Sequence, residues 1–596
     1  MIRPIRGRFL LLSVNSHSYR FTSMHPGLRL AVLLMSAFLL LIGAPDLAAA
    51  QDGVADLILE GEVWTGDKDR PRAEAVAVEG NRILAVGSRP AVREHEGTET
   101  RTIRVEDGLI TPGIIDNHTH FNRAGALLLG INLLDVNDPD TLAERVRAAR
   151  ERLPDGSWIV GGDWGAYAQW EQGGDTDAGG EPVLEPHRDL IDEVTPETPV
   201  LLSRYDDEQY LANERALEQA GLSCEDAGVD CEDGRRTGRL TPEAVDRVRD
   251  VRPKKPWSRR MAETDTALTR LRKHGVTEIH DITTPTQLRL FQQFKDEGEL
   301  TVRVYARPKI HYWDKLDAVG IEHGYGDARL RIGGLKGFVD GILGNSTARF
   351  YESYEHRDSR GQWRDHMEEG MQAYINGAAR TDHWPQVHAI GTQAIDTLLT
   401  MYERAQQAVE GTEEQRWRVI HAQHLRGPEV ADRMAELDIT AEMQPVHLID
   451  DMRWVERRVG KERARWSWAL KTIHEAGVHL SFGSDWPGTN AAWYTSNPLH
   501  GIYAAAERKT VNGKPEGGWV PQERISRELA LRAYTVNNAY AAGMEDEKGR
   551  VQPGMLADLT VLSADITDPS TDLLETEVLY TIVDGEIVYA SGGNSE

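Results

Sequence analysis

Segments with the alternating pattern of half-buried β-strands occur near both ends of this chain. Apolar and polar side chains alternate over 56–87, and the same pattern returns over 557–562 and 578–590. Neither end has enough strands to close a sandwich by itself. The pattern therefore predicts one small β-sandwich domain assembled from both termini, over 51–110 and 546–596, with the rest of the chain inserted between its two halves.

The long middle of the chain alternates short apolar runs with helical patterns. Eight runs are candidate strands, at 109–117, 276–281, 302–306, 335–340, 387–389, 419–422, 439–444 and 479–485. Eight strands separated by helices are what a TIM (β/α)8 barrel needs, so the sequence predicts an α/β barrel over 111–545. A ninth run, at 200–202, is assigned to an insertion at about 130–260 between the first two barrel strands.

The first 50 residues differ in composition from everything after them. A positively charged start at Met24 to Arg29 precedes an apolar run over 30–44, and three alanines precede Gln51. This pattern predicts a signal peptide over 1–50, cleaved near Ala50/Gln51, and a periplasmic or secreted protein. The apolar run is shorter than the roughly 20 residues of a membrane span, so a permanent anchor is the weaker reading. Whether translation starts at Met1 or Met24 stays open.

Charge and cysteine content exclude several classes of protein. The chain has 68 basic and 95 acidic residues, a net charge of −27, whereas nucleic-acid binding needs clustered Lys and Arg. The only cysteines, Cys224 and Cys231, lie seven positions apart. In an oxidising compartment such a pair favours a local disulfide over a metal site. A Cys-rich zinc cluster and a thiolate nucleophile are both excluded.

Two histidines close the first candidate barrel strand. Side chains at positions i and i+2 of an extended chain point to the same side, so His118 and His120 can share one metal ion. His-x-His pairs also arise by chance, so the pair alone is a weak signal. Its position strengthens it, because functional residues of a barrel project from the carboxyl ends of the strands.

Other polar residues recur in or after later strands. His388, His421 and Asp485 each end a candidate strand. Together with the first pair they form an N/O set that suits zinc or a related divalent ion, one or two per chain. Lys336 lies inside an apolar strand, where desolvation favours a neutral, reactive amine. The alternative for Lys336 is a buried ion pair with Asp340 or another acid.

Seven motifs in a fixed order carry a family resemblance. They are LITPGIIDNHTHF (109–121), KGFVDG (336–341), VHAIG (387–391), HAQ (421–423), QPVH (444–447), SFGSDWP (481–487) and GMLADLTVL (554–562). With them the chain resembles the amidohydrolase superfamily, in particular the amidohydrolase family 3, YtcJ-like group that includes N-substituted formamide deformylases. The resemblance implies a metal-dependent-hydrolase barrel with a composite β-domain. It also implies these roles: His118 and His120 as first-strand ligands, Lys336 as a carboxylated bridging ligand, His388 and His421 as ligands of a second metal, and Asp485 as ligand and proton acceptor.

The resemblance further implies an exported hydrolase that cleaves an amide-type C–N bond of a small molecule through metal-activated water (EC 3.5). Trp164, Tyr205 and Trp486 are candidates for an apolar substrate pocket. Glu208 is a further substrate-binding candidate, because it stands where relatives often have a histidine. A metal-dependent esterase, lactonase or phosphotriesterase and a non-catalytic binding protein stay open as alternatives. A homodimer is also compatible with the sequence.

Overall fold

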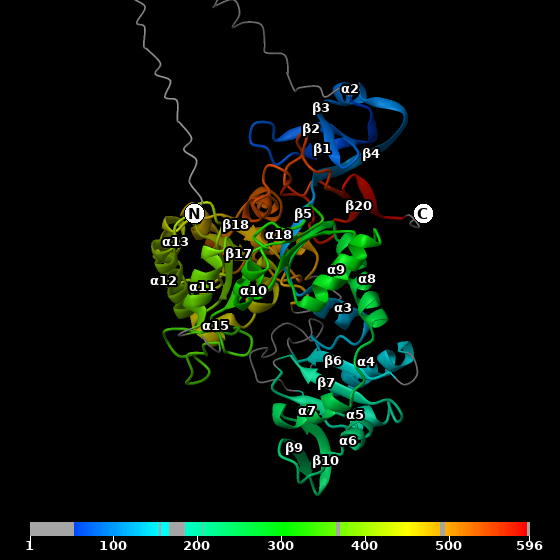
Figure 1. The fold of residues 1–596 in the computed structure, drawn as a ribbon, viewed down its shortest axis with the longest axis vertical. Coiled ribbons are helices and arrows are strands. Elements are labelled where there is room, and N and C mark those ends of the chain that lie inside the picture. Colours follow the sequence, from blue (N-terminus) through cyan, green and yellow to red (C-terminus); the bar gives the residue numbers. More distant parts are fainter. Residues whose placement is uncertain are drawn as a thin grey trace, which may run out of the picture. The chain divides into compact units, whose positions relative to one another are not determined.

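The computed structural model describes residues 53–136, 138–153, 157–165, 184, 186–205, 207–364, 367, 370–488 and 495–592 (Figure 1). Contacts divide the chain into units 1–52 and 53–596. The predicted signal peptide at 1–50 lies outside the described residues. Within those residues, none of the helices combines the length and the apolar character that crossing a membrane would take.

Strands from both ends of the chain form one sheet. Its members are β1 (Ala55–Trp64), β2 (Arg72–Glu79), β3 (Arg82–Gly87), β4 (Glu96–Pro112), β19 (Leu559–Leu562), β20 (Val578–Val583) and β21 (Glu586–Ala590), with α2 (Arg89–Arg93) beside them. They follow the order β21-β20-β19-β4-β1-β2-β3, and β19 runs antiparallel to β4 with Leu559 opposite Pro112 (Figure 1). The alternating residues Val76, Val78 and Ile83 pack in its core. The two ends therefore meet as expected, but in one seven-stranded sheet, so a two-sheet sandwich is not confirmed.

Each of the eight apolar runs that were predicted as barrel strands contains a β-strand. One parallel sheet contains β5 (Ile114–Thr119), β11 (Val276–Ile282), β12 (Arg303–Arg307) and β13 (Leu330–Ile332); a second contains β14 (Leu335–Phe338), β15 (Pro385–Ala389), β16 (Arg418–His421), β17 (Thr440–Met443) and β18 (Leu480–Phe482). The first candidate divides at Gly113 between β4 and β5. A Cβ at Gly113 would lie 2.2 Å from Thr277 Oγ1, so the chain passes from one domain to the other where only glycine fits.

Two isolated parallel bridges connect the two parallel sheets. Thr119 forms an isolated parallel bridge with Trp486, and Lys309 forms one with Lys336. Among the described residues, the two parallel sheets are joined by these single bridges and not by continuous ladders. We call the two sheets arcs, because together they do not form one closed hydrogen-bonded barrel. Because every ladder within the arcs is parallel, the carboxyl ends of the strands share one edge.

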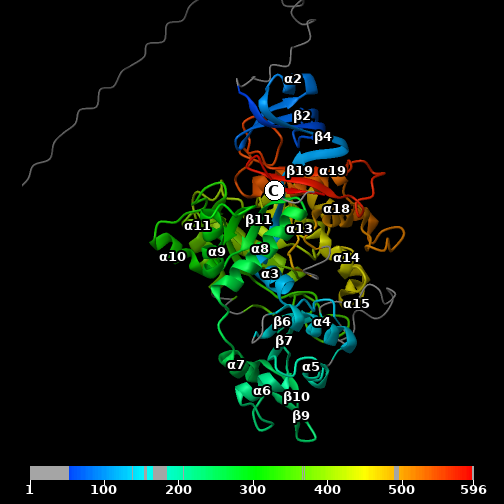
Figure 2. The ribbon, with the colours of Figure 1, turned by 90° about the vertical axis from the view of Figure 1, so that its right-hand side faces the viewer.

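Helices alternate with the barrel strands (Figures 1 and 2). They are α3 (Phe121–Leu129), α8 (Trp257–Lys273), α9 (Pro285–Asp296), η1 (Ile310–Tyr312), α10 (Trp313–Ala318), α11 (Gly370–Arg380), α12 (Thr392–Ala408), α13 (Pro428–Glu436), η2 (Pro445–His447), α14 (Leu448–Asp451), α15 (Val455–Val459), α16 (Lys461–Ala464), α17 (Leu470–Glu475), α18 (Pro498–Glu507), η3 (Pro521–Glu523), α19 (Arg527–Tyr534) and α20 (Val536–Ala541). In α12 the residues Ile395, Leu398, Leu399 and Tyr402 are fully buried, a helical spacing that turns one apolar face to the core.

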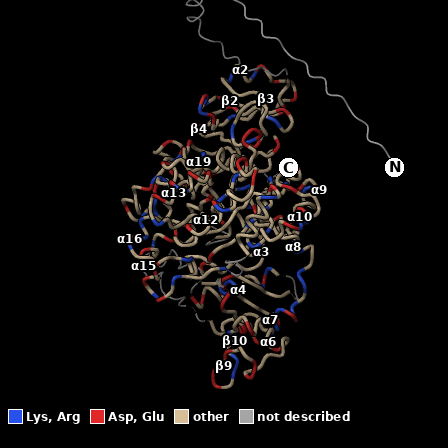
Figure 3. Tube along the Cα trace, turned by 60° about the vertical axis from the view of Figure 1, so that its left-hand side comes forward, with Lys and Arg blue, Asp and Glu red and all other residues tan. Residues whose placement is uncertain are grey.

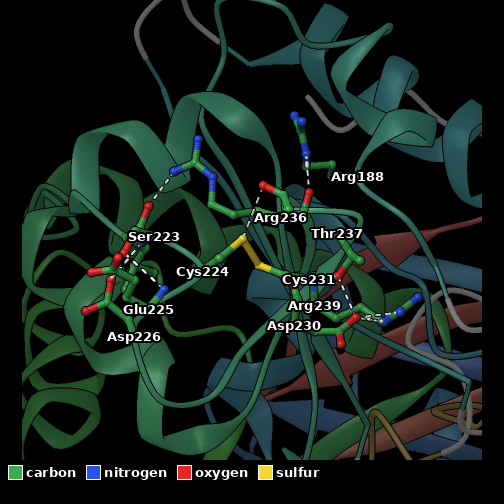
Figure 4. Close-up of a disulfide and its surroundings, with 12 residues drawn as sticks. Arg188, Ser223, Cys224, Glu225, Asp226, Asp230, Cys231, Arg236, Thr237 and Arg239 are labelled. Atoms are coloured by element: carbon green, nitrogen blue, oxygen red, sulfur yellow. Dashed lines mark hydrogen bonds and ion pairs between the residues drawn. A yellow bond between two sulfur atoms is a disulfide. The ribbon is translucent and has the colours of Figure 1, made fainter.

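The predicted insertion has its own sheet. Strands β6 (Ile159–Trp164), β7 (Val200–Arg204), β8 (Tyr210–Ala212), β9 (Val229–Glu232) and β10 (Arg235–Leu240) follow the order β6-β7-β8-β10-β9, and helices α4 (Pro139–Arg152), α5 (Asp189–Asp192), α6 (Glu214–Ala220) and α7 (Pro242–Val251) accompany them. The run at 200–202 is β7, outside the barrel sheets as expected. Cys224 and Cys231 form the predicted disulfide, beside Arg236 and Thr237 of β10 (Figure 4).

Charged residues of both signs are interspersed along the described chain (Figure 3). The net charge of −27 therefore does not come from a single acidic block among these residues.

Candidate active site

The predicted ligands lie in or after strands of the two arcs. His118 is in β5 and His120 follows it, Lys336 is in β14, His388 is in β15, His421 ends β16, and Asp485 follows β18. The backbone N–H of Asp485 donates a hydrogen bond to His118 O, 2.8 Å away, and this bond connects the segment after β18 to β5. Since parallel strands end on one edge, side chains from distant parts of the sequence can meet there.

Contacts between neighbouring side chains join all six residues in one cluster. The Asp485 Oδ1 atom is 3.4 Å from His118 Nε2 and 3.0 Å from His120 Nε2. The ring centroid of His421 lies 5.1 Å from that of His118 and 4.5 Å from that of His388. Lys336 Nζ is 3.5 Å from His118 Nε2. The structure thus brings together every residue that the sequence proposed as a ligand.

The donor set fits a divalent metal ion. His118, His421 and Asp485 each offer one ligand atom, and these atoms lie within 4.8 Å of one another. His118 Nδ1 is 2.6 Å from Glu442 Oε1, and His421 Nδ1 is 2.6 Å from Gln444 Oε1. A partner on one ring nitrogen orients the imidazole and leaves the other nitrogen for a metal. Two oriented imidazoles and a carboxylate match the preference of zinc for nitrogen and oxygen ligands.

Electrostatics hold these groups in the states that bind metals. Burial lowers the pKa of His118 well below its usual value. Burial, with neighbouring His388, does the same to the pKa of His421. Burial alone would raise the pKa of Asp485, but attraction to His118 and to His120 holds it well below the ordinary range. The imidazoles are therefore neutral and the carboxylate ionised at neutral pH, as ligands must be.

Lys336 does not make the ion pair that the alternative interpretation required. Asp340 accepts hydrogen bonds from the backbone N–H groups of Ile390, at 3.1 Å, and Gly391, at 2.9 Å. Within the described part of the chain, Lys336 forms no ion pair with a carboxylate at 4.0 Å or less. Its side chain is buried, and burial together with the positive charge of Arg307 lowers its pKa well below the usual value. The ammonium form is thus disfavoured.

The sequence analysis missed a buried acid next to the cluster. Glu442 of β17 is fully buried and contacts His118, Arg307 and Arg418. Burial by itself would raise the pKa of Glu442, but Arg307 and the hydrogen bond with His118 hold it well below its usual range. The sequence could have indicated Glu442, because Glu442 and Arg418 are charged residues within apolar strands, as Lys336 is.

A further histidine also lies close to the cluster. His447 Nε2 is 3.8 Å from Asp485 Oδ2, and its ring stacks on that of His421 with 6.4 Å between centroids. The QPVH motif contains His447, but the motif alone assigns it no role.

The predicted substrate-binding residues have different environments. Trp164 is fully buried in the core of the insertion, and Trp486 is fully buried with its ring edge-on to Phe121. Glu208 is exposed after β7. Tyr205 donates a hydrogen bond from its hydroxyl to Gly344 O, 3.3 Å away. Contact of these side chains with a substrate stays a prediction.

Comparison with known proteins identifies relatives along almost the whole described chain. Residues 101–589 match the model of the amidohydrolase family. The Arabidopsis thaliana protein LONG AFTER FAR-RED 3 is 32% identical over 90% of this chain and 92% of its own length. The YtcJ protein of Bacillus subtilis (strain 168) is 29% identical over 89% and 98%. The N-substituted formamide deformylase of Arthrobacter pascens is 25% identical over 90% and 99%.

A solved structure has a similar fold. The crystal structure of an uncharacterized metal-dependent hydrolase from Pyrococcus furiosus matches with a TM-score of 0.67 and 25% sequence identity, over 86% of this chain and 100% of that one. The resemblance drawn from the seven motifs is confirmed by the family model and by the YtcJ and formamide deformylase relatives.

Proposed function

The chain belongs to the amidohydrolase family, and from this premise we propose that it is a metal-dependent hydrolase that cleaves an amide-type C–N bond of a small molecule. The observation that carries the proposal is the cluster of His118, His421 and Asp485, whose donor atoms converge within 4.8 Å. The choice of bond is supported by the relative that is an N-substituted formamide deformylase.

Each protein group has a distinct task in this proposal. A divalent ion, zinc or a related one, would supply polarisation of the substrate carbonyl and a lower pKa for water. His118 and His120 would hold the first ion, and His388 and His421 would hold the second. Asp485 is ionised, so it can accept a proton from water at a carboxylate oxygen and deliver it to the departing nitrogen.

Lys336 is proposed as a carboxylated bridging ligand. A neutral amine can add to carbon dioxide, forming an N–C bond and releasing a proton. The pKa of Lys336 is lowered by burial and by Arg307, which favours the neutral amine that this addition needs. Two metal ions per chain are expected with the carboxylated lysine and one without it.

We further propose export, on the basis of the charged start, apolar run and alanines that precede Gln51. The mature chain would be periplasmic or secreted, without a permanent membrane span and with no nucleic-acid partner; the homodimer stays an untested alternative. N-terminal sequencing of protein from the culture or periplasm should begin at Gln51. A start upstream of residue 51 in that fraction would contradict the proposed cleavage.

The test of the reaction combines metal content with a substrate panel. Metal per chain is measured by mass spectrometry on protein purified without chelator, and activity is measured on N-substituted formamides, other amides, esters, lactones and phosphotriesters. We expect bound metal and fastest turnover of an amide, abolished by chelator and restored by Zn²⁺. Faster turnover of an ester, lactone or phosphotriester would contradict the proposed cleavage of a C–N bond. Absence of metal uptake on adding Zn²⁺ would favour a binding protein.

A further inference from the structure

Glu442 lies at the centre of a buried group of charges within the barrel. Its Oε1 atom is 2.6 Å from His118 Nδ1 and 2.8 Å from an Arg307 guanidinium nitrogen. Its Oε2 atom is 3.0 Å from the same Arg307 nitrogen and 2.8 Å from Arg418. All four side chains are almost completely shielded from solvent. Both carboxylate oxygens therefore have partners, and one of these partners is a predicted metal ligand.

The two arginines determine what this carboxylate can do to His118. Guanidinium groups are permanent cations and donors only, and an ionised carboxylate accepts only. With Arg307 and Arg418 as donors to Glu442, the contact with His118 requires the proton on Nδ1. The unprotonated Nε2 then faces the cluster, where Asp485 Oδ1 is 3.4 Å away and Lys336 Nζ is 3.5 Å away.

We propose that Glu442 is a positioning residue that fixes the Nδ1–H tautomer and the ring orientation of His118, with Arg307 and Arg418 fixing Glu442 in turn. This inference rests on the proposed metal-dependent function. A carboxylate behind a metal-binding histidine orients the ring and increases its basicity, and its loss lowers metal affinity. Glu442 acts through His118 and need not touch the substrate.

A second buried acid provides a matched control. Arg418 contacts His280 Nδ1 at 3.0 Å, His280 Nε2 is 3.1 Å from Glu278 Oε1, and Glu278 also forms an ion pair with Lys548. Glu278, like Glu442, is a buried strand carboxylate in contact with one imidazole, and it pairs with one cation where Glu442 pairs with two. Its imidazole is not a predicted ligand. Loss of Glu278 should therefore affect stability without affecting the metal site.

The test compares Glu442→Gln with Glu278→Gln in the full mature chain. The glutamine keeps the size of the side chain, but it removes the charge and adds a donor that can face His118 Nδ1. Affinity for Zn²⁺ alone is measured by competition with a chromophoric chelator, and folding is checked by circular dichroism. We expect Glu442→Gln to bind Zn²⁺ about 10–100-fold more weakly than the parent protein and Glu278→Gln to keep the parent affinity.

A further variant keeps the test decisive if Glu442→Gln does not fold. Glu442→Asp keeps the carboxylate and shortens it, so a folded Glu442→Asp should bind Zn²⁺ with an affinity between those of the parent and the expected glutamine value. Parent affinity in a folded Glu442→Gln, or in Glu442→Asp when only that variant folds, would overturn the inference. Equal losses in Glu442→Gln and Glu278→Gln would also overturn it. If the parent protein takes up no Zn²⁺, the proposed function fails first.

Discussion

Arg303→Met is expected to destabilise the protein strongly, because it breaks a buried link between the barrel and the composite sheet. Arg303 Nε is 2.6 Å from Asp558 Oδ2 and its second nitrogen is 2.9 Å from Oδ1, a bidentate pair. The side chains of Arg303 and Asp558 are 2% and 6% exposed. Removing one partner of such a pair leaves a buried charge uncompensated, at a cost of about 3–5 kcal/mol. That is a large part of a net stability of roughly 5–15 kcal/mol.

An exposed pair of the same length provides the comparison. Arg82 and Glu547 approach to 2.6 Å, but their side chains are 44% and 47% exposed. Water screens this pair, so Arg82→Met should change the free energy of unfolding by only about 0.2–1 kcal/mol. The predicted difference between the two variants comes from burial and not from distance.

The assay is equilibrium unfolding in urea, followed by tryptophan fluorescence and by circular dichroism. A double variant, Arg303→Met with Asp558→Asn, should recover much of the lost stability, because it removes the buried unpaired carboxylate, while Asp584, the second partner of Arg303, keeps its ion pair with Arg329. Equal losses for Arg303→Met and Arg82→Met would refute the reasoning. A double variant that is no more stable than Arg303→Met would refute it as well.

Three further predictions concern other parts of the chain. Asp485→Asn should lower turnover by about 10²–10⁴-fold while the protein still contains metal, measured by steady-state kinetics and mass spectrometry; undiminished turnover would contradict the proton-transfer role. Burial lowers the pKa of His274 to about 3 in the folded state, against 6.5. The unfolded chain therefore binds a proton first as pH falls through 6.5, and stability present above that pH is lost progressively down to about 3. Urea unfolding at pH 7 and pH 5 should show a loss of about 2 kcal/mol from this residue, absent in His274→Gln. Replacing Cys224 and Cys231 by serine should cost about 2.5 kcal/mol in the insertion, because the closed loop is short; limited proteolysis should detect it there, with Zn²⁺ affinity unchanged.

Local patterns predicted most of the strands and the six ligand candidates. Short apolar runs are typical of buried strands, so eight of the nine strands described in the two arcs could be found one by one, while the short β13 was missed. The division at Gly113 was missed, because β4 and β5 form one continuous apolar run and only packing against Thr277 separates them. The composite domain was expected as a sandwich, but its seven strands pair in one sheet.

The residues near the carboxyl ends of the strands could be found from the sequence, since a strand depends on neighbours a few positions away. Which distant residues meet depends on the tertiary structure. Glu442 lies 324 positions from His118 and Asp558 lies 255 positions from Arg303, yet each pair is in direct contact. Such contacts depend on strand order and register, and a shift of one residue would turn either side chain to the opposite face of its sheet. The candidate ligands near the strand ends could therefore be predicted from local sequence. The contacts that buried charges such as Glu442 make with these ligands could be identified only in the folded barrel.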